Sequence, residues 1–169
     1  MSKLAAIRRV AAVVGLTAAG IIGTASLSAA APATVLYDWP AGVACEFPLK
    51  VETTGESSEY KELPGKNGDL RLLLAGKGLP LTFTNTATGE SLSLKANGAV
   101  QHVTLHPDGS STFVLTGHNV IFLFPTDTPA GPSTTLHVGR VEFTATPPNN
   151  DFTIQNVSGT TTDLCAALT

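Results

Sequence analysis

Short runs of alternating apolar and polar residues follow one another between Leu79 and Pro125. A period of two is typical of strands that bury one face, and polar turn residues separate the runs. Leu81 and Phe83 share one face of the first run, and Leu92 and Leu94 share one face of the next. We therefore expect a series of short strands here, with no room for a long helix.

The turn residues predict how these strands connect. Asn97-Gly98 fits the two positive-φ positions of a type I′ hairpin turn, and Pro107-Asp108-Gly109 fits a second tight turn. Gly117-His118-Asn119 interrupts the alternation, so we expect a separate strand at Val120–Phe124. Its five consecutive apolar residues predict a strand that is covered on both faces and lies centrally in the core.

The remaining runs extend this pattern over most of the chain. The inward-facing parity changes at Gly139-Arg140, which predicts a β-bulge there. Turns recur every eight to twelve residues or so, and we expect about nine or ten strands in a single antiparallel β-sandwich. A closed up-and-down β-barrel is the alternative. Further strands are expected at Cys45–Val51, Leu70–Leu74, Thr135–Ala145 and Phe152–Val157.

Residues 1–33 have the three parts of a cleaved secretory signal peptide. A basic start precedes the uncharged apolar stretch Val10–Ile22, and small residues follow it. Ala31-Pro32-Ala33 fits a cleavage site, and cleavage after Ala30 is the alternative. We expect residues 34–169 to form a single β domain after cleavage.

Removal of the signal peptide makes the chain more acidic. The whole chain has 10 basic and 13 acidic residues, and residues 34–169 keep seven of the bases and all of the acids, for a net charge of −6. Nucleic acids and anionic membranes both need a basic face, so we expect neither as a partner. No second hydrophobic segment follows the first, so we expect no stable membrane insertion after cleavage. Arg8-Arg9 permits twin-arginine export, but ordinary secretion to an extracellular location is favoured.

The two cysteines, Cys45 and Cys165, are far apart in the sequence. An even pair in an oxidising compartment predicts one disulfide. The wide spacing excludes a CxxC redox motif and a zinc knuckle. We expect the bond to join the first strand to the end of the chain.

Four histidines are the first candidates for chemistry. His102 and His106 have a spacing that would bind a metal on a helix, but on a strand they lie about 13 Å apart. His118 falls in a turn, and His137 alternates with inward apolar residues. No G-x-S-x-G motif is present, and the acids are scattered over loops. We expect no catalytic residue, no metal ligand and no cofactor.

Trp39 and Asp127 are the candidates for an interaction surface. Trp39 is the only tryptophan, and it could stack on a sugar ring or a partner. The alternative, which is favoured, is that it closes one end of the core. Asp127 lies in the proline-rich loop Thr126–Ser133, where a side-chain-stabilised turn is favoured over a single metal contact.

Several short motifs resemble those of small exported actinobacterial proteins of uncharacterised function. The motifs are Phe124–Pro132, Val138-Gly139-Arg140 and Ser158-Gly159-Thr160, followed by Cys165. The likeness extends more loosely from Cys45 through the turns described above. The alanine-rich, lysine-poor signal peptide is also similar to those of high-GC bacteria. The resemblance implies export and one small β domain, and it implies no activity.

These features favour an exported, non-catalytic β domain that binds a cell-surface protein or glycan. A secreted hydrolase or metal-dependent enzyme is the first alternative, and it requires two or more histidines to meet a carboxylate in a pocket. A barrel-type carrier of a small apolar ligand is the second alternative, and it requires an internal cavity.

Overall fold

The structure, a computed structural model, describes residues 32–56 and 59–169. Residues 1–31, which hold nearly all of the expected signal peptide, lie outside the described residues. The first strand starts at Thr34, directly after the expected cleavage site. The described chain contains ten strands and one short 3₁₀ helix: β1 Thr34–Trp39, β2 Leu49–Thr53, β3 Lys61–Leu63, β4 Leu70–Gly76, β5 Leu81–Asn85, β6 Ser91–Leu94, β7 Ala99–Leu105, β8 Ser111–Leu123, β9 Ser133–Thr146, β10 Asp151–Asp163 and η1 Ala166–Leu168.

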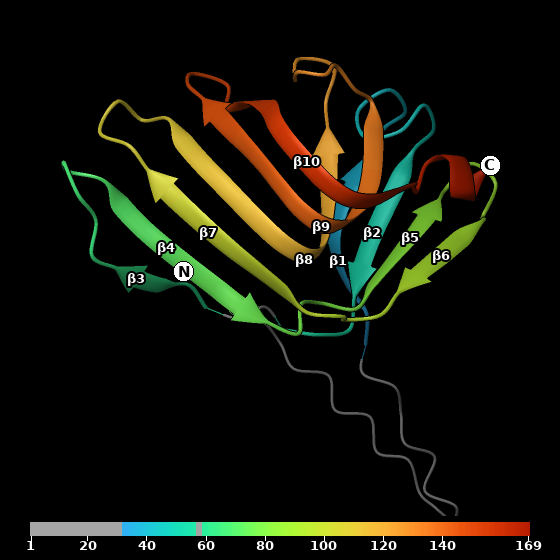
Figure 1. Cartoon of the computed structure of the whole chain (residues 1–169). Coiled ribbons are helices and arrows are strands. Elements are labelled where there is room, and N and C mark those ends of the chain that lie inside the picture. Colours follow the sequence, from blue (N-terminus) through green and yellow to red (C-terminus); the bar gives the residue numbers. More distant parts are fainter. Residues whose placement is uncertain (1–31, 57–58) are drawn as a thin grey trace, which may run out of the picture. The chain divides into compact units, whose positions relative to one another are not determined.

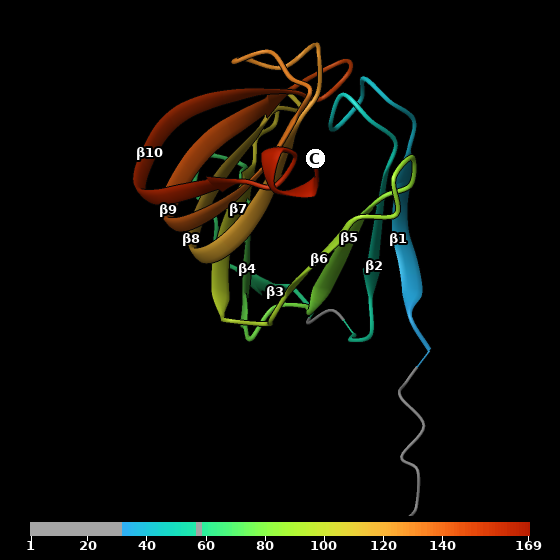
Figure 2. The same cartoon turned by 90° about the vertical axis from the view of Figure 1, so that its right-hand side faces the viewer.

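The strands form two antiparallel sheets. One sheet has four strands in the order β1-β2-β5-β6, and the other has six in the order β10-β9-β8-β7-β4-β3 (Figure 1). Figure 2 shows the two sheets as separate layers. The expected all-β fold, an antiparallel β-sandwich, is confirmed. The barrel alternative is wrong because both sheets keep open edges.

Apolar residues from both sheets form the core between them. Leu49 and Val51 of β2 and Phe83 of β5 are fully buried, and Val120 and Phe122 of β8 pack against them from the other sheet. Burial of one such side chain contributes about 1.5–3 kcal/mol to stability. The alternating positions of β2 and β5 therefore hold the four-stranded sheet against β8.

β8 is covered on both faces, as its apolar run predicts. Ile121 and Leu123 alternate with the residues that face the other sheet, and they pack in a second cluster with Leu115. The expected break at 117–119 is wrong, because β8 runs without interruption through Gly117. Gly117 has a φ of 89°, so it changes the direction of the strand while its pairing continues.

Three glycines lie side by side where the six-stranded sheet bends. Gly117, Gly139 and Gly159 pair across β8, β9 and β10, and all three have positive φ. Figure 2 shows the strong curvature of these strands. Leu115 and Ile121, which lie on either side of Gly117 in β8, pack in the second cluster together with Val141 and Phe143. The sheet therefore bends at the row of glycines and encloses this second cluster.

The β-bulge expected at Gly139-Arg140 is wrong. The register of β9 with β8 is regular through both residues. The shift lies in β10, between Ile154 and Asn156. A glycine with positive φ thus produces the change of parity that a bulge was expected to produce.

The hairpin expected at Asn97-Gly98 is also wrong. β6 pairs only with β5, whereas β7 pairs with β4 and β8 in the other sheet. Gly98 has a φ of 83°, but Asn97 is not in the positive-φ region that a type I′ turn requires at both positions. The segment crosses from one sheet to the other. By contrast, the turn at Pro107-Asp108-Gly109 joins β7 to β8 as expected.

Candidate functional site: an apolar cleft between the sheets

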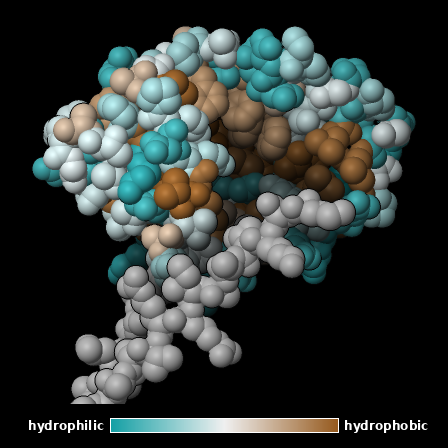
Figure 3. All heavy atoms as spheres, turned by 180° about the vertical axis from the view of Figure 1, so that it is seen from behind, coloured by the Kyte–Doolittle hydropathy of each residue, from teal (hydrophilic) through white to brown (hydrophobic). Residues whose placement is uncertain are grey.

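A cavity of about 290 Å³ lies between the two sheets. In the view from behind, apolar surface extends into a hollow of the molecule (Figure 3). We call this cavity the inter-sheet cleft. Its apolar lining comes from both sheets and from one connection: Leu36, Tyr37, Val51, Leu81 and Leu94 of the four-stranded sheet, Leu74, Ala99, Leu115, Val120, Phe122 and Leu136 of the six-stranded sheet, and Leu79 of the β4–β5 connection.

Two connections that cross between the sheets border the cleft. One links β4 to β5 and carries Lys77, and the other links β6 to β7 and carries Lys95. The Gly98 N–H donates to the Lys77 carbonyl oxygen (2.7 Å), and this bond joins the two connections. The His118 N–H donates to the Gly98 carbonyl oxygen (3.0 Å) and ties both to β8. This end of the cleft is therefore held together by the backbone.

An aromatic group forms part of the wall. Tyr37 stacks on Trp39 with ring centroids 4.5 Å apart, and Trp39 meets Phe122 and Phe124 edge-on at 4.8 and 5.6 Å. Tyr37 and Phe122 line the cleft, whereas Trp39 lies half-buried behind them against the core. The structure thus places Trp39 where the core-closing interpretation expects it, in contact with the wall of the cleft.

The six-stranded sheet contributes two uncharged polar side chains to the cleft. Gln101 Oε1 accepts a hydrogen bond from the Tyr60 hydroxyl (2.8 Å), and burial raises the pKa of Tyr60. Asn119 is only 5% exposed, and its Nδ2 donates to the Thr116 carbonyl oxygen (3.1 Å). Asn119 Oδ1 is enclosed and has no hydrogen-bond partner among the described residues. The inner surface therefore offers few polar groups to a ligand.

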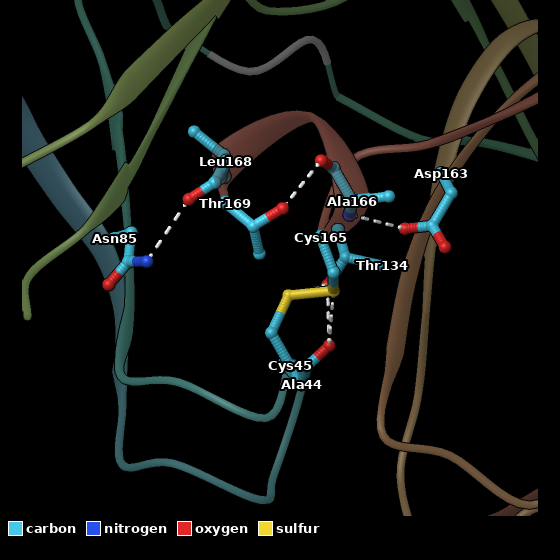
Figure 4. The surroundings of a disulfide bond; sticks show 9 residues. All are labelled: Ala44, Cys45, Asn85, Thr134, Asp163, Cys165, Ala166, Leu168 and Thr169. Atoms are coloured by element: carbon cyan, nitrogen blue, oxygen red, sulfur yellow. Dashed lines mark hydrogen bonds between the residues drawn. A yellow bond between two sulfur atoms is a disulfide. The ribbon is translucent and has the colours of Figure 1, made fainter. Parts of the chain in front are cut away.

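The expected disulfide between Cys45 and Cys165 is confirmed, with the two Cα atoms 5.6 Å apart (Figure 4). Cys45 was expected in the first strand, but it lies in the β1–β2 connection. β1 ends at Trp39, and β2 starts only at Leu49. The bond fixes η1 beside the four-stranded sheet. There the Asn85 Nδ2 donates to the Leu168 carbonyl oxygen (3.1 Å).

Thr134 completes the surroundings of the disulfide. Its hydroxyl, fully buried, donates to the Ala44 carbonyl oxygen (2.8 Å) next to Cys45. β9 is thereby joined to the β1–β2 connection across the two sheets. The disulfide region serves to hold the sheets together at the end of the chain, and none of these residues lines the cleft.

Asp127 is 5% exposed, and its carboxylate is used by backbone groups. Its two oxygens accept hydrogen bonds from the Phe124 N–H and the Phe152 N–H, both at 2.6 Å. The Asp127 N–H also donates to the Phe124 carbonyl oxygen (3.0 Å), which closes the turn. Asp127 therefore fastens the β8–β9 loop to the start of β10 and presents little surface to a partner.

The four histidines lie in different surroundings. His106 bridges Asp69 and Thr112, with Nδ1 3.0 Å from Asp69 Oδ1 and Nε2 2.9 Å from Thr112 Oγ1. This order of carboxylate, imidazole and hydroxyl is that of a hydrolase triad. However, none of the three residues lines the inter-sheet cleft or the cavity of about 280 Å³ that shares Leu81, Leu94 and Lys95 with it. Their contacts join the ends of β4, β7 and β8.

The other histidines make no such contact. His102 is exposed on β7, and His118 is exposed at the end of the cleft. His137 lies opposite Asn119 on the neighbouring strand, and burial lowers its pKa. Within residues 32–56 and 59–169, no group of three or more histidine, cysteine or acidic side chains is arranged to hold a metal ion.

Comparisons with other proteins leave the geometry as the main guide to function. No family model matches the chain, and neither the curated proteins nor the solved structures give a match. In the part of the chain that the structure describes, no helix is both long and apolar enough to cross a membrane.

Some apolar residues of the cleft could be expected from the sequence, but the cleft itself could not. Leu81 and Leu94 were expected as inward-facing positions of a packed core. Alternation shows which side of a strand is apolar, but it does not show how closely the two sheets approach. Lys77 and Lys95 gave no signal, because each lies alone in a polar connection.

Proposed function

We propose that this protein is an exported, non-catalytic binding domain that takes a small apolar ligand between its sheets. The observation that carries the proposal is the inter-sheet cleft, which is apolar, open and bordered by a rigid backbone frame. Clefts that bind small molecules are mostly apolar and carry a few placed polar groups. Of the functions expected from the sequence, a carrier of a small apolar ligand fits this geometry best, although on a sandwich and not on a barrel.

Export is supported by the signal-peptide features of residues 1–33 and by the disulfide, which persists in oxidising compartments. The motifs shared with small exported actinobacterial proteins support the same setting. Binding to a cell-surface protein or glycan stays a prediction. Trp39 is a weaker candidate for the contact with such a partner, because the residue packs against the core.

A neutral fluorescent naphthylamine tests the proposal, because its binding does not depend on charge. We expect one saturable site on the folded mature protein, together with quenching of Trp39, which touches the wall of the cleft. Leu36 lines the cleft, whereas the adjacent Val35 does not, and both are exposed on the edge strand β1. Leu36→Asp should weaken binding about fivefold or more, since part of a leucine contact is lost.

Val35→Asp is the matched control, with the same change of charge on the same strand. It should bind the probe as the wild type does. Absence of saturable binding to the wild type, or equal weakening by both substitutions, contradicts the proposal. Far-UV circular dichroism of both variants checks that the sheets remain formed.

A further inference from the structure

The charges around the inter-sheet cleft have the opposite sign to the charge of the domain. Residues 34–169 contain 13 acidic and only seven basic residues. Nevertheless, the twenty residues that line the cleft include two lysines and one histidine, and none is an aspartate or a glutamate. An apolar cleft with a cationic border in an acidic domain is complementary to an anion attached to an apolar group.

The cationic side chains come from the segments that the backbone holds together at one end of the cleft. Lys77 lies in the β4–β5 connection and Lys95 in the β6–β7 connection, and Gly98 bonds to the first of these and to β8. Both lysines are exposed. The ion pairs within the described residues are Lys50–Glu52, His106–Asp69 and Arg140–Glu142, so neither lysine belongs to one.

The acidic residue that shares a cavity with Lys95 already forms an ion pair. Lys95 also borders the smaller cavity, where Glu52 is the acidic lining residue. The Glu52 carboxylate pairs with Lys50 at 3.0 Å on the same strand. The ammonium groups beside the cleft therefore remain open to an anion from solution.

We infer that the ligand is an anionic single-chain amphiphile. Its hydrocarbon chain lies against the apolar walls, and its carboxylate or phosphate head binds at Lys77 and Lys95. The cavity of about 290 Å³ lies just below the range of about 300–1,000 Å³ that is usual for ligand clefts, which favours a ligand with one hydrocarbon chain over one with two. This inference rests on the proposed function and names the ligand class of the same site.

The head group should add a moderate and salt-dependent part of the affinity. An ion pair at an exposed site contributes up to about fivefold, so two lysines contribute up to about 25-fold. Because exposed charges are screened by salt, this part should decrease as the ionic strength rises. The contribution of the ligand's hydrocarbon chain to the affinity should stay the same when the lysines are substituted.

Isothermal titration of the mature protein with chain-matched ligands tests the inference below their micellar concentrations. The ligands are dodecanoate, dodecyl phosphate, dodecanol and dodecyltrimethylammonium. We expect both anions to bind more tightly than the alcohol, and the cation to bind most weakly. The ratio of the dissociation constants of dodecanoate and dodecyl phosphate shows whether a carboxylate or a phosphate is the preferred head group.

A double variant, Lys77→Gln/Lys95→Gln, should weaken the binding of dodecanoate by about three- to 25-fold and leave the binding of dodecanol unchanged. Lys61→Gln/Lys66→Gln is the control, since it removes the same charge from exposed positions that do not line the cleft. Equal binding of all four ligands, or equal weakening by the two double variants, overturns the inference while the proposed function stands. If none of the four ligands binds, the proposed function fails as well.

Discussion

Loss of the disulfide should destabilise the domain strongly, because the bond closes a very long loop. Cys45 and Cys165 are 120 residues apart in the sequence. The chain-entropy relation gives about 5 kcal/mol for a loop of this length at 25 °C. Unfolding entropy is about 2.1 cal/mol/K per residue, so for residues 34–169 the midpoint of thermal unfolding should fall by roughly 15–20 °C.

The perturbation is the double variant Cys45→Ala/Cys165→Ala. Alanine is suitable because Cys45 is 1% exposed, and a serine hydroxyl would be buried there. Urea unfolding at 25 °C measures the free energy of unfolding and its denaturant dependence. We expect the free energy to fall by several kcal/mol and the dependence to become steeper, because the unfolded chain becomes more expanded.

The reduced wild-type protein is the control, since it loses the bond but keeps both sulfur atoms. It should unfold close to the double variant. A double variant within about 1 kcal/mol of the oxidised protein, with the same denaturant dependence, would refute the entropic argument. In that case, the buried contacts of Leu164 and Leu168 would hold the C-terminus without the bond.

Two further predictions concern the bend of the six-stranded sheet and its half-buried histidine, His137. Gly139→Ala should destabilise the domain by several kcal/mol, because the added Cβ would overlap the Ser158 carbonyl oxygen. The control is Gly89→Ala, where φ is also positive but the space is open, and it should lower the free energy of unfolding by only about 1–2 kcal/mol. Equal losses of the two variants in urea unfolding would contradict this account. Burial holds the pKa of His137 below its ordinary value of 6.5, so protonation opposes folding, and the stability that is fully present above pH 6.5 should decrease as the pH falls below it. His137→Gln should reduce this decrease between about pH 7.5 and pH 5, and an identical pH profile of unfolding midpoints in both proteins would exclude His137 as its source.

The fold class could be predicted from the sequence because it depends on local signals. Alternating residues such as Leu49 and Val51, or Leu92 and Leu94, lie on the apolar sides of their strands as expected. The turn at Pro107–Gly109 was predicted for the same reason, since proline and glycine impose their backbone angles locally.

The errors concern positions where a neighbouring strand decides the outcome. Asn97-Gly98 has the composition of a hairpin turn, but β7 pairs with β4 and β8, so the segment crosses between the sheets. Gly117 has the composition of a loop, but it pairs with Ala99 of β7 and Gly139 of β9, and this pairing keeps β8 continuous. β1 was not expected as a strand, because its exposed residues do not alternate and only its pairing with β2 defines it.

The amino-acid sequence by itself determined an antiparallel β-sandwich, an excess of acidic residues from residue 34 onward and a single pair of cysteines able to form a bond. Side-chain periodicity, charge and cysteine count are properties of the chain, and they hold before any contact forms. The tertiary structure alone decided which strands are neighbours and where the sheet bends. It also placed Lys77 and Lys95 beside one apolar cleft, although 17 residues with two strands lie between them. The physical reason is that such a site depends on the distance between two sheets, and that distance results from the packing of all side chains between them.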